Sequence, residues 1–158
     1  MRIAIYPGSF DPITIGHLDI IERSVKIFDK VVIAILVNPR KQPTFSASQR
    51  KVLIERSTAH LANVEVIVSE SLTIEVAKKY GANVLIRGIR AVADYEYELQ
   101  QATTNMILDE NIETLFMVAR PEYSFLSSSV AKELAQYHCD LTKILPSAII
   151  DDVKAKFQ

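Results

Sequence analysis

Short apolar segments rich in β-branched residues alternate with helical patterns along the whole chain. The most constraining of them is the run VVIAILV at 31–37, which is apolar throughout, as expected of a strand covered on both faces. Similar strand patterns occur at 2–6, 64–68, 84–86 and 114–118. Helical patterns separate them at 18–28, 46–58, 73–80, 92–108 and 128–137, and a final helix follows Pro146. This alternation predicts an α/β fold with an open, five-stranded parallel sheet and helices on both faces.

Local signals mark several of these helices. Ser46, with Gln49 three residues later, forms a capping-box pattern that starts the helix at 46–58. Gly81 can adopt the left-handed conformation that closes a helix, and so ends the helix at 73–80. The helix at 92–108 carries one apolar stripe, which indicates either core or a subunit interface. The stripe consists of Val92, Tyr95, Leu99, Ala102 and Met106.

The composition indicates one globular domain, residues 1–158, and the alternation of strands and helices indicates that its fold is Rossmann-like. Hydrophobic residues make up 49% and charged residues 23% of the chain, and no repeat or flexible linker divides it. The net charge of -1 argues against broad electrostatic binding to nucleic acid or to an anionic membrane. The longest apolar run is too short to cross a bilayer and no signal-peptide pattern opens the chain, so we expect a cytoplasmic protein. Cys139 is the only cysteine, which excludes an intrachain disulfide.

The segment AIYPGSFDPITIGH at 4–17 leads from an apolar strand through Gly8 and a polar loop into a helix. A strand that opens onto a helix N-terminus in this way makes an anion site, because free backbone N–H groups and the helix dipole point at the ligand. Ser9 and Thr14 add hydroxyl groups and His17 adds an imidazole in the first turn. The loop therefore suits a phosphate group, although an ordinary turn with a buried histidine would give the same pattern.

Polar clusters follow every strand of the predicted sheet, at 7–17, 40–41, 69–73, 87–90 and 120–129. Because ligands of open parallel sheets bind beyond the carboxyl ends of the strands, one crevice can collect all five clusters. Its cations would be Lys41, Arg87 and Arg90, and its hydroxyl donors would be the serines at 127–129. This convergence predicts a ligand with more than one phosphate group.

Several common phosphate and acyl-transfer motifs are absent. There is no G-x-x-x-x-G-K-[ST] P-loop, no G-x-G-x-x-G dinucleotide fingerprint and no G-x-S-x-G nucleophile elbow. A site rich in cations and donors but without a strong nucleophile suits phosphoryl or nucleotidyl transfer, where positioning and charge stabilisation supply most of the rate. Carboxylates are scarce in the clusters, so we expect no metal site in the protein itself. Mg²⁺ would then be bound mainly through the substrate phosphates.

Three segments, YPGSFDPITIGH, VLIRGIRAVADYEYE and YSFLSSS, resemble the phosphopantetheine adenylyltransferase family, colinearly over essentially the whole chain. The wider superfamily carries an H-x-G-H motif, in which Thr14 here replaces the first histidine, as is normal for this family. The IRGIRAVADYEYE segment is more specific and separates the family from its cytidylyl and nicotinamide-nucleotide relatives. The resemblance implies that ATP and 4′-phosphopantetheine give dephospho-coenzyme A and pyrophosphate with Mg²⁺, without a covalent intermediate.

The resemblance also implies the roles of individual residues. His17 and Lys41 are the expected catalytic residues. The 4′-phosphopantetheine site would comprise Ser9, Lys41, Thr73 and Arg87. The ATP site would comprise Ser9, Phe10, His17, Gly88, Ile89, Arg90, Glu98, Tyr123, Ser124, Phe125, Leu126, Ser127, Ser128 and Ser129. A homohexamer and feedback inhibition by coenzyme A are further implications of the family.

Other interpretations of the same residues remain open. The chain could be a sister nucleotidyltransferase acting on another phosphate monoester, or a nucleotide-binding module without catalysis. Arg87 and Arg90 could be surface salt-bridge partners of the acidic residues at 94, 96 and 98. The serines at 127–129 could cap the following helix, which is compatible with phosphate binding. His60 and His138 lie outside the polar clusters, so we interpret them as surface or structural residues.

Overall fold

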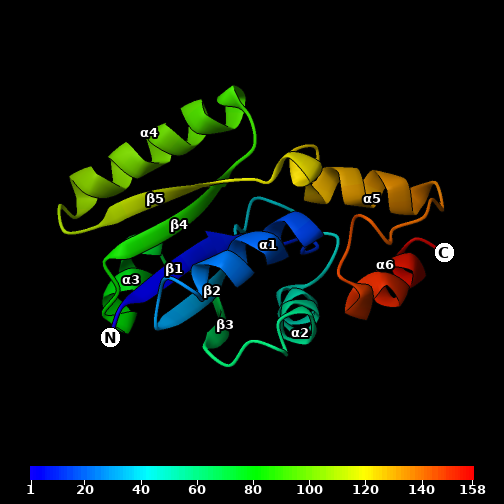
Figure 1. The fold of residues 1–158 in the computed structure, drawn as a ribbon, viewed down its shortest axis with the longest axis horizontal. Helices are drawn as coiled ribbons and strands as arrows, with labels where there is room; N and C mark the ends of the chain where they lie inside the picture. The colour runs from blue at the N-terminus through cyan, green and yellow to red at the C-terminus, as the bar shows by residue number, and fades with distance from the viewer.

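The computed structural model describes all residues, Met1–Gln158, as one α/β domain (Figure 1). The strands are β1 (Ile3–Gly8), β2 (Lys30–Leu36), β3 (Val64–Ser69), β4 (Val84–Ile89) and β5 (Glu113–Val118). The helices are α1 (Ile15–Ser24), α2 (Ala47–Ser57), α3 (Thr73–Tyr80), α4 (Val92–Leu108), α5 (Ser128–Gln136) and α6 (Ile150–Lys156). Two 3₁₀ turns, η1 (Pro121–Tyr123) and η2 (Ser147–Ile149), precede α5 and α6. The predicted Rossmann-like α/β class is confirmed.

The five strands form one parallel sheet in the order β3-β2-β1-β4-β5. The chain builds outward from β1 to β3, then crosses back to lay β4 on the other side of β1. The direction of winding therefore reverses between β1 and β4, and in open α/β sheets ligands bind at this switch point. The carboxyl ends of these two strands carry Gly8 and Arg87, from two of the predicted polar clusters.

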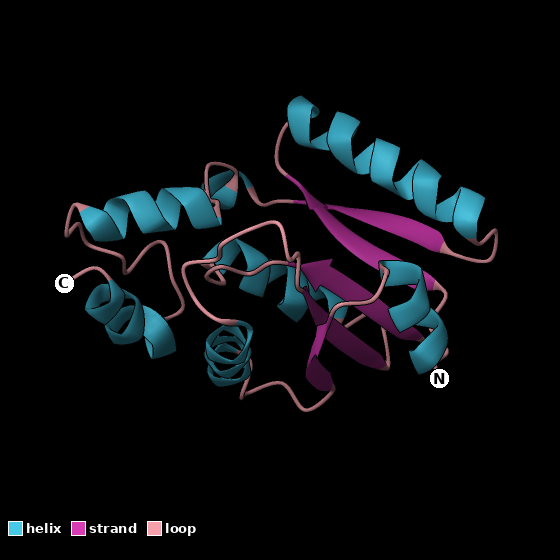
Figure 2. Cartoon of the chain, turned by 180° about the vertical axis from the view of Figure 1, so that it is seen from behind, coloured by secondary structure: helices cyan, strands magenta, loops and turns pink.

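Helices cover both faces of the sheet, as the apolar run of β2 predicts. Figure 1 shows α1 in front of the strands, and the reverse view in Figure 2 shows α3 in front. Alternate residues of β2 enter two separate cores, because successive side chains of a strand point to opposite faces. Val31, Ile33 and Ile35 join the larger core of 23 residues on the α1 side. Val32 and Ala34 join the smaller core of nine residues on the α3 side.

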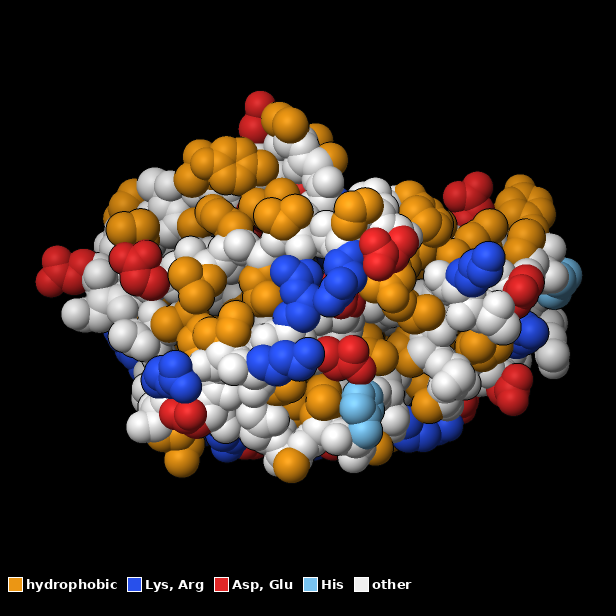
Figure 3. Space-filling model, in the orientation of Figure 1, with side chains coloured by type: hydrophobic (Ala, Val, Ile, Leu, Met, Phe, Trp, Pro, Cys, Tyr) orange, Lys and Arg blue, Asp and Glu red, His pale blue; other side chains and the backbone are white.

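Helix α4 differs from the other helices because little of it is buried. Of its apolar stripe only Ala102 lies in the core, whereas Val92 is 76% exposed and Leu99 is 43% exposed. Of the two predicted alternatives, the stripe is therefore not core within one chain. Figure 3 shows hydrophobic side chains gathered over the region of α4 and β5. None of the helices combines the length and apolar character that a membrane-spanning helix needs.

Several element boundaries differ from the predicted ones; helix α1 ends at Ser24 and not at residue 28, and three other differences lie at the site. Helix α1 starts at Ile15 and not at residue 18, because Thr14 caps it. Strand β1 continues through Gly8, and β4 continues through Ile89 and not only to residue 86. Arg87 and Gly88 are thus strand residues, in register with Phe116 and Met117 of β5, and not loop residues. The predicted strand ends at residue 86 because the charged Arg87 interrupts its apolar pattern. The partners of Arg87, Glu98 and the Pro7 carbonyl, lie in other elements.

Candidate active site

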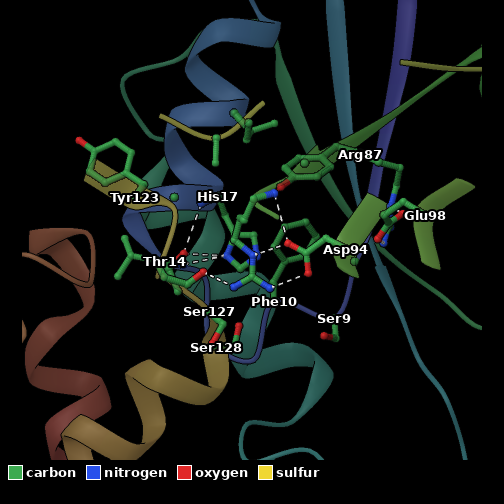
Figure 4. A pocket seen from close by; sticks show the side chains of 18 of the residues that line it. Ser9, Phe10, Thr14, His17, Arg87, Asp94, Glu98, Tyr123, Ser127 and Ser128 are labelled. Atoms are coloured by element: carbon green, nitrogen blue, oxygen red, sulfur yellow. Dashed lines mark hydrogen bonds and ion pairs between the residues drawn. The ribbon is translucent and has the colours of Figure 1, made fainter. Parts of the chain in front are cut away.

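Two cavities open at the carboxyl ends of β1 and β4 and share a wall. The smaller has a volume of about 230 Å³ and the larger about 660 Å³. Both are lined by Pro7, Gly8, Ser9, Arg87 and Ser128. Figure 4 shows side chains from β1, α1, β4, α4 and the loop before α5 converging on the smaller cavity. Two ligands bound in these cavities would meet at Ser9 and Arg87.

His17 lies in the first turn of α1, where Thr14 fixes its ring. The Thr14 hydroxyl accepts from the His17 backbone N–H at 3.3 Å, and Nδ1 of His17 accepts from the Thr14 backbone N–H at 3.0 Å. This is a capping box in which a histidine occupies the place usually taken by glutamate or glutamine. Because Nδ1 accepts a hydrogen bond, the proton of the neutral ring lies on Nε2.

The surroundings of His17 favour its neutral form. Burial lowers the pKa of His17 to about 4, and the positive charges of Arg90 and Arg87 contribute to the shift. At pH 7 the ring is therefore uncharged, with Nε2–H as its one donor. Such a group can donate a hydrogen bond to a phosphate oxygen, but its Nδ1 is already occupied by Thr14.

Gly8 and Phe10 give the loop its tight shape. Phe10 has a positive φ of 47°, is 2% exposed, and packs edge-to-face on the rings of Tyr6 and His17, with centroids 5.2 Å apart in each pair. A Cβ on Gly8 would lie 3.0 Å from the Cε2 and Cζ atoms of Phe10. The glycine is therefore needed for the close approach of the Phe10 ring, which in turn supports the ring of His17.

Arg87 and Glu98 form the central ion pair of the site. The Arg87 Nε and Nη2 atoms donate to the two Glu98 oxygens at 2.6 and 2.7 Å, and Nη1 donates to the Pro7 carbonyl at 2.8 Å. Burial opposes the charge of Arg87, but the hydrogen bonds and charge of Glu98 outweigh it and raise the pKa of Arg87. Glu98 is 8% exposed, so it is not the solvated helix residue that its position in the pattern suggests.

Arg90 connects the start of α4 to the loop before α5. Its Nε and Nη2 atoms donate to the Asp94 carboxylate at 3.1 and 3.2 Å, and Nη1 donates to the Leu126 carbonyl. The predicted pairing of both arginines with acidic residues is therefore correct, with Glu98 and Asp94 as the partners, but the Arg87–Glu98 pair is largely buried and not a surface pair. Both arginines also line the smaller cavity, so pairing and ligand contact are compatible here.

The loop before α5 delivers hydroxyl groups and a helix N-terminus. Ser127 caps α5 by accepting from the Val130 N–H at 3.1 Å, and the Ser128 hydroxyl donates to the Pro12 carbonyl at 2.7 Å. Tyr123, Leu126, Ser127 and Ser128 line the smaller cavity, whereas Ser129 lines the larger one. Three residues predicted for the ATP site, Ile89, Ser124 and Phe125, line neither cavity.

All four residues predicted for the acceptor site line the larger cavity, namely Ser9, Lys41, Thr73 and Arg87. Lys41 is exposed on the loop between β2 and α2, while Thr73 begins α3. The larger cavity thus joins segments that are far apart in the sequence. Its position beside the smaller cavity fits a reaction between two bound ligands.

Comparisons with known proteins show which family the chain belongs to. The cytidylyltransferase-like family matches residues 5–134. The phosphopantetheine adenylyltransferase of Lachnoclostridium phytofermentans is 50% identical over 157 residues, covering 99% of this chain and 96% of the relative. The enzyme of that name from Picosynechococcus sp. is 52% identical over 151 residues, covering 96% and 85% of the two chains. The chain belongs to the phosphopantetheine adenylyltransferase family.

The fold has a wider distribution than the family. A solved structure from Vibrio parahaemolyticus, assigned as a nicotinate-nucleotide adenylyltransferase, superposes with a TM-score of 0.74, covering 100% of this chain and 98% of the other. The two chains are only 16% identical, so this likeness concerns the fold alone.

The sequence patterns do not predict several residues that line the larger cavity of this family member. Tyr97, Gln101 and Asn105 face the larger cavity from one side of α4, at the i, i+4 and i+8 spacing. The spacing is present in the sequence, but the sequence does not indicate which face of α4 packs on the sheet, so it does not predict that these residues line a cavity. Asp11 and Arg50 also line the larger cavity, and only the folded chain brings them together.

Proposed function

We propose that this family member transfers the adenylyl group of ATP to 4′-phosphopantetheine, giving dephospho-coenzyme A and pyrophosphate. The observation that carries the proposal is the pair of cavities with a common wall at Ser9 and Arg87. ATP would occupy the smaller cavity, against His17 and the start of α5. 4′-Phosphopantetheine would occupy the larger cavity, with its phosphate near Ser9 and Lys41.

The reaction needs one bond formed and one broken at phosphorus. An oxygen of the acceptor phosphate attacks the α-phosphorus of ATP, and the bond from that phosphorus to the bridging oxygen of pyrophosphate breaks on the opposite side. No side chain needs to become covalently attached, since the chain only has to align two phosphates and stabilise their charge.

His17 would act on the charge that develops at the α-phosphate. Its Nε2–H can donate to a non-bridging oxygen, because Thr14 holds Nδ1 as an acceptor. A fixed neutral donor in a partly buried site stabilises a transition state without reorganisation. Lys41 would neutralise the attacking phosphate. The α5 N-terminus and Arg90 would bind the departing pyrophosphate.

Mg²⁺ would come with ATP. No group of three or more His, Cys, Asp or Glu side chains is placed to hold a metal ion, and Asp94 and Glu98 are already paired with arginines. This donor set fits a cation that keeps its waters and binds through phosphate oxygens. The ion would neutralise negative charge on the triphosphate.

Three further properties belong to the same proposal. Coenzyme A would inhibit, because it carries both a pantetheine arm and an adenine nucleotide and can enter both cavities. A cytoplasmic location is consistent with two highly charged substrates. A homohexamer would cover the exposed apolar residues of α4 and β5.

Pyrophosphate release from ATP and Mg²⁺, measured with and without 4′-phosphopantetheine, tests the proposal. Release that requires 4′-phosphopantetheine supports it. Release with a different phosphate monoester, and not with 4′-phosphopantetheine, would assign the chain to a sister nucleotidyltransferase. ATP binding without release under any of these conditions would indicate a binding module and contradict the proposal.

A further inference from the structure

Arg50 lies in α2 beside the larger cavity and bonds to two loops of the site. It is 3% exposed, although arginine is rarely buried without a partner. Its Nη1 donates to the Ser9 carbonyl at 2.7 Å and its Nε donates to the Phe45 carbonyl at 3.1 Å. One guanidinium therefore connects the loop after β1 to the loop after β2.

The surroundings of this charge are unfavourable for stability alone. Arg50 lies one turn into α2, near the positive end of the helix dipole. Burial lowers the pKa of Arg50, and only the charge of Asp11 counteracts it. Both of its bonds go to neutral carbonyl groups, whereas buried arginines are usually compensated by a carboxylate pair. A neutral side chain would serve the core of α2 better, so the charge points to a role in the neighbouring site.

Asp11 binds the segment at 44–45, whose last carbonyl group accepts a hydrogen bond from Arg50. Its Oδ2 accepts from the Thr44 N–H at 2.8 Å and its Oδ1 accepts from the Phe45 N–H at 2.8 Å. The Lys132 ammonium lies 3.5 Å from the same carboxylate. The peptide at 44–45 is thus held through its N–H groups by Asp11 and through its last carbonyl by Arg50. Lys41 is only three residues before this anchored point.

We propose that Arg50 is a positioning residue for adenylyl transfer, which sets the distance between the Ser9 loop and the Lys41 loop. The inference rests on the proposed function and adds a residue to it. Arg50 would act through the two loops and not on the reacting atoms. The two loops face the acceptor phosphate from different strands, so their separation decides whether the phosphate reaches an attacking geometry. A displacement of about 1 Å at such a point can lower turnover about 100-fold.

Arg50→Lys is the sharpest test. Lysine keeps the charge and most of the length, but its single ammonium lacks the planar fork that reaches two carbonyl groups. Arg56→Lys is the matched control, because Arg56 lies on the same helix and pairs with Asp152 at the surface. We expect kcat of Arg50→Lys to fall about 100-fold while KM for ATP stays within about threefold of the wild type. The control should keep both values.

A structural readout accompanies the kinetics. Amide hydrogen exchange at 38–45 should be faster in Arg50→Lys than in the wild type and in the control, because the loop loses an anchor. Free guanidinium ion added to Arg50→Ala should restore part of kcat. Asp11→Asn weakens the opposite grip on the same peptide. Should Arg50→Lys not fold, Asp11→Asn is expected to give the same exchange pattern with a smaller loss of kcat.

Each failure has its own signature. A folded Arg50→Lys with wild-type kcat overturns the inference, as does a loss of kcat with unchanged exchange at 38–45. If the wild type itself makes no pyrophosphate with 4′-phosphopantetheine, the proposed function fails instead. The exchange measurement then still decides whether Arg50 holds the two loops together.

Discussion

At the scale of single residues, the tautomer of His17 is the detail with the largest chemical consequence. We expect His17→Ala to lower turnover by about 100- to 1,000-fold, the range for loss of one oxyanion-type donor, with ATP affinity nearly unchanged. The reason is that Nε2–H acts on charge that exists mainly in the transition state. Steady-state kinetics and ATP titration give the two quantities. An equal loss in both would contradict this role.

His17 also gives the stability a defined pH dependence. Its pKa is about 4 in the folded chain, below the ordinary value of 6.5. Between these values the unfolded chain binds more protons, so the free energy of unfolding falls as the pH drops from 6.5 towards 4. His17→Gln removes this contribution and should flatten the dependence. Urea unfolding at pH 7 and pH 5 measures the free energy of unfolding of both proteins. If that free energy changes by the same amount between the two pH values in the wild type and in His17→Gln, the prediction is refuted.

Arg87 is expected both to stabilise the fold, through its ion pair with Glu98, and to bind the acceptor substrate. We expect Arg87→Ala to weaken 4′-phosphopantetheine at least about tenfold, as for a lost charged hydrogen bond, and ATP much less. The change also leaves the buried Glu98 carboxylate without its partner, which should lower the free energy of unfolding by about 2 kcal/mol. This is less than for a fully buried pair, because the Arg87 side chain is partly exposed. Separate titrations of the two ligands and denaturant unfolding provide the data.

A second substitution separates the two roles of Arg87. Arg87→Ala combined with Glu98→Gln should recover part of the stability without recovering acceptor affinity, because the stranded charge is gone but the guanidinium is still missing. Glu98→Gln alone is the control. If Arg87→Ala lowered the affinity for ATP more than the affinity for 4′-phosphopantetheine, Arg87 would belong to the ATP site and the prediction would be contradicted.

At the scale of elements, the sequence predicts a helix end correctly where a capping residue close in sequence defines it. Helices α3 and α4 have the predicted bounds, and Gly81 ends α3 with a φ of 64°. The Ser46–Gln49 capping box is present as predicted. The start of α1 was misplaced because His17 serves as the third residue of a capping box, a use that glutamate-based patterns do not reveal. These errors are local and leave the sheet unchanged.

The site was predictable as a set of loops but not as a set of contacts. The polar clusters at the strand ends are visible in sequence, and the parallel topology places them at one edge. The burial of Glu98 depends on the face that α4 turns to the sheet, and the role of Arg50 depends on two loops from different strands. Such tertiary relations have no local pattern, so only the folded chain reveals them.

The glycine that ends β1 carries a further prediction. Gly8→Ala should lower turnover about tenfold, because its Cβ would press on the Phe10 ring that supports His17, and should cost about 1–2 kcal/mol as for overpacking. Gly81→Ala is the matched control, since it costs about 1 kcal/mol through its left-handed φ but lies far from the site. Equal turnover in the two variants would exclude the steric link to His17.

At the scale of the whole molecule, the strand order explains why the two cavities adjoin. The reversal between β1 and β4 leaves Gly8 and Arg87 on neighbouring strands, with loops leaving in opposite directions along the sheet edge. The donor and the acceptor of a group transfer can then approach from two sides. The same reversal puts α4 and β5 at the end of the sheet, where no further element covers them.

The uncovered end of the molecule carries the last prediction. Its exposed apolar side chains outside the larger cavity are Val92, Tyr95, Leu99, Met106, Ile107, Leu108, Leu115 and Val118. So many exposed apolar side chains on two neighbouring elements are typical of an interface, because a monomer would leave them in water. We expect light scattering to give a mass several times the 17.7 kDa of one chain.

Charges placed on this face should split the assembly. Leu99→Lys combined with Met106→Lys buries two ammonium groups in the expected interface, so the mass should fall towards that of a single chain. Val52→Lys is the control, because Val52 is 45% exposed on α2, away from α4 and β5, and should leave the mass unchanged. A wild-type mass of 17.7 kDa would mean that the apolar face stays in water. A split by the control alone would locate the interface on α2 instead.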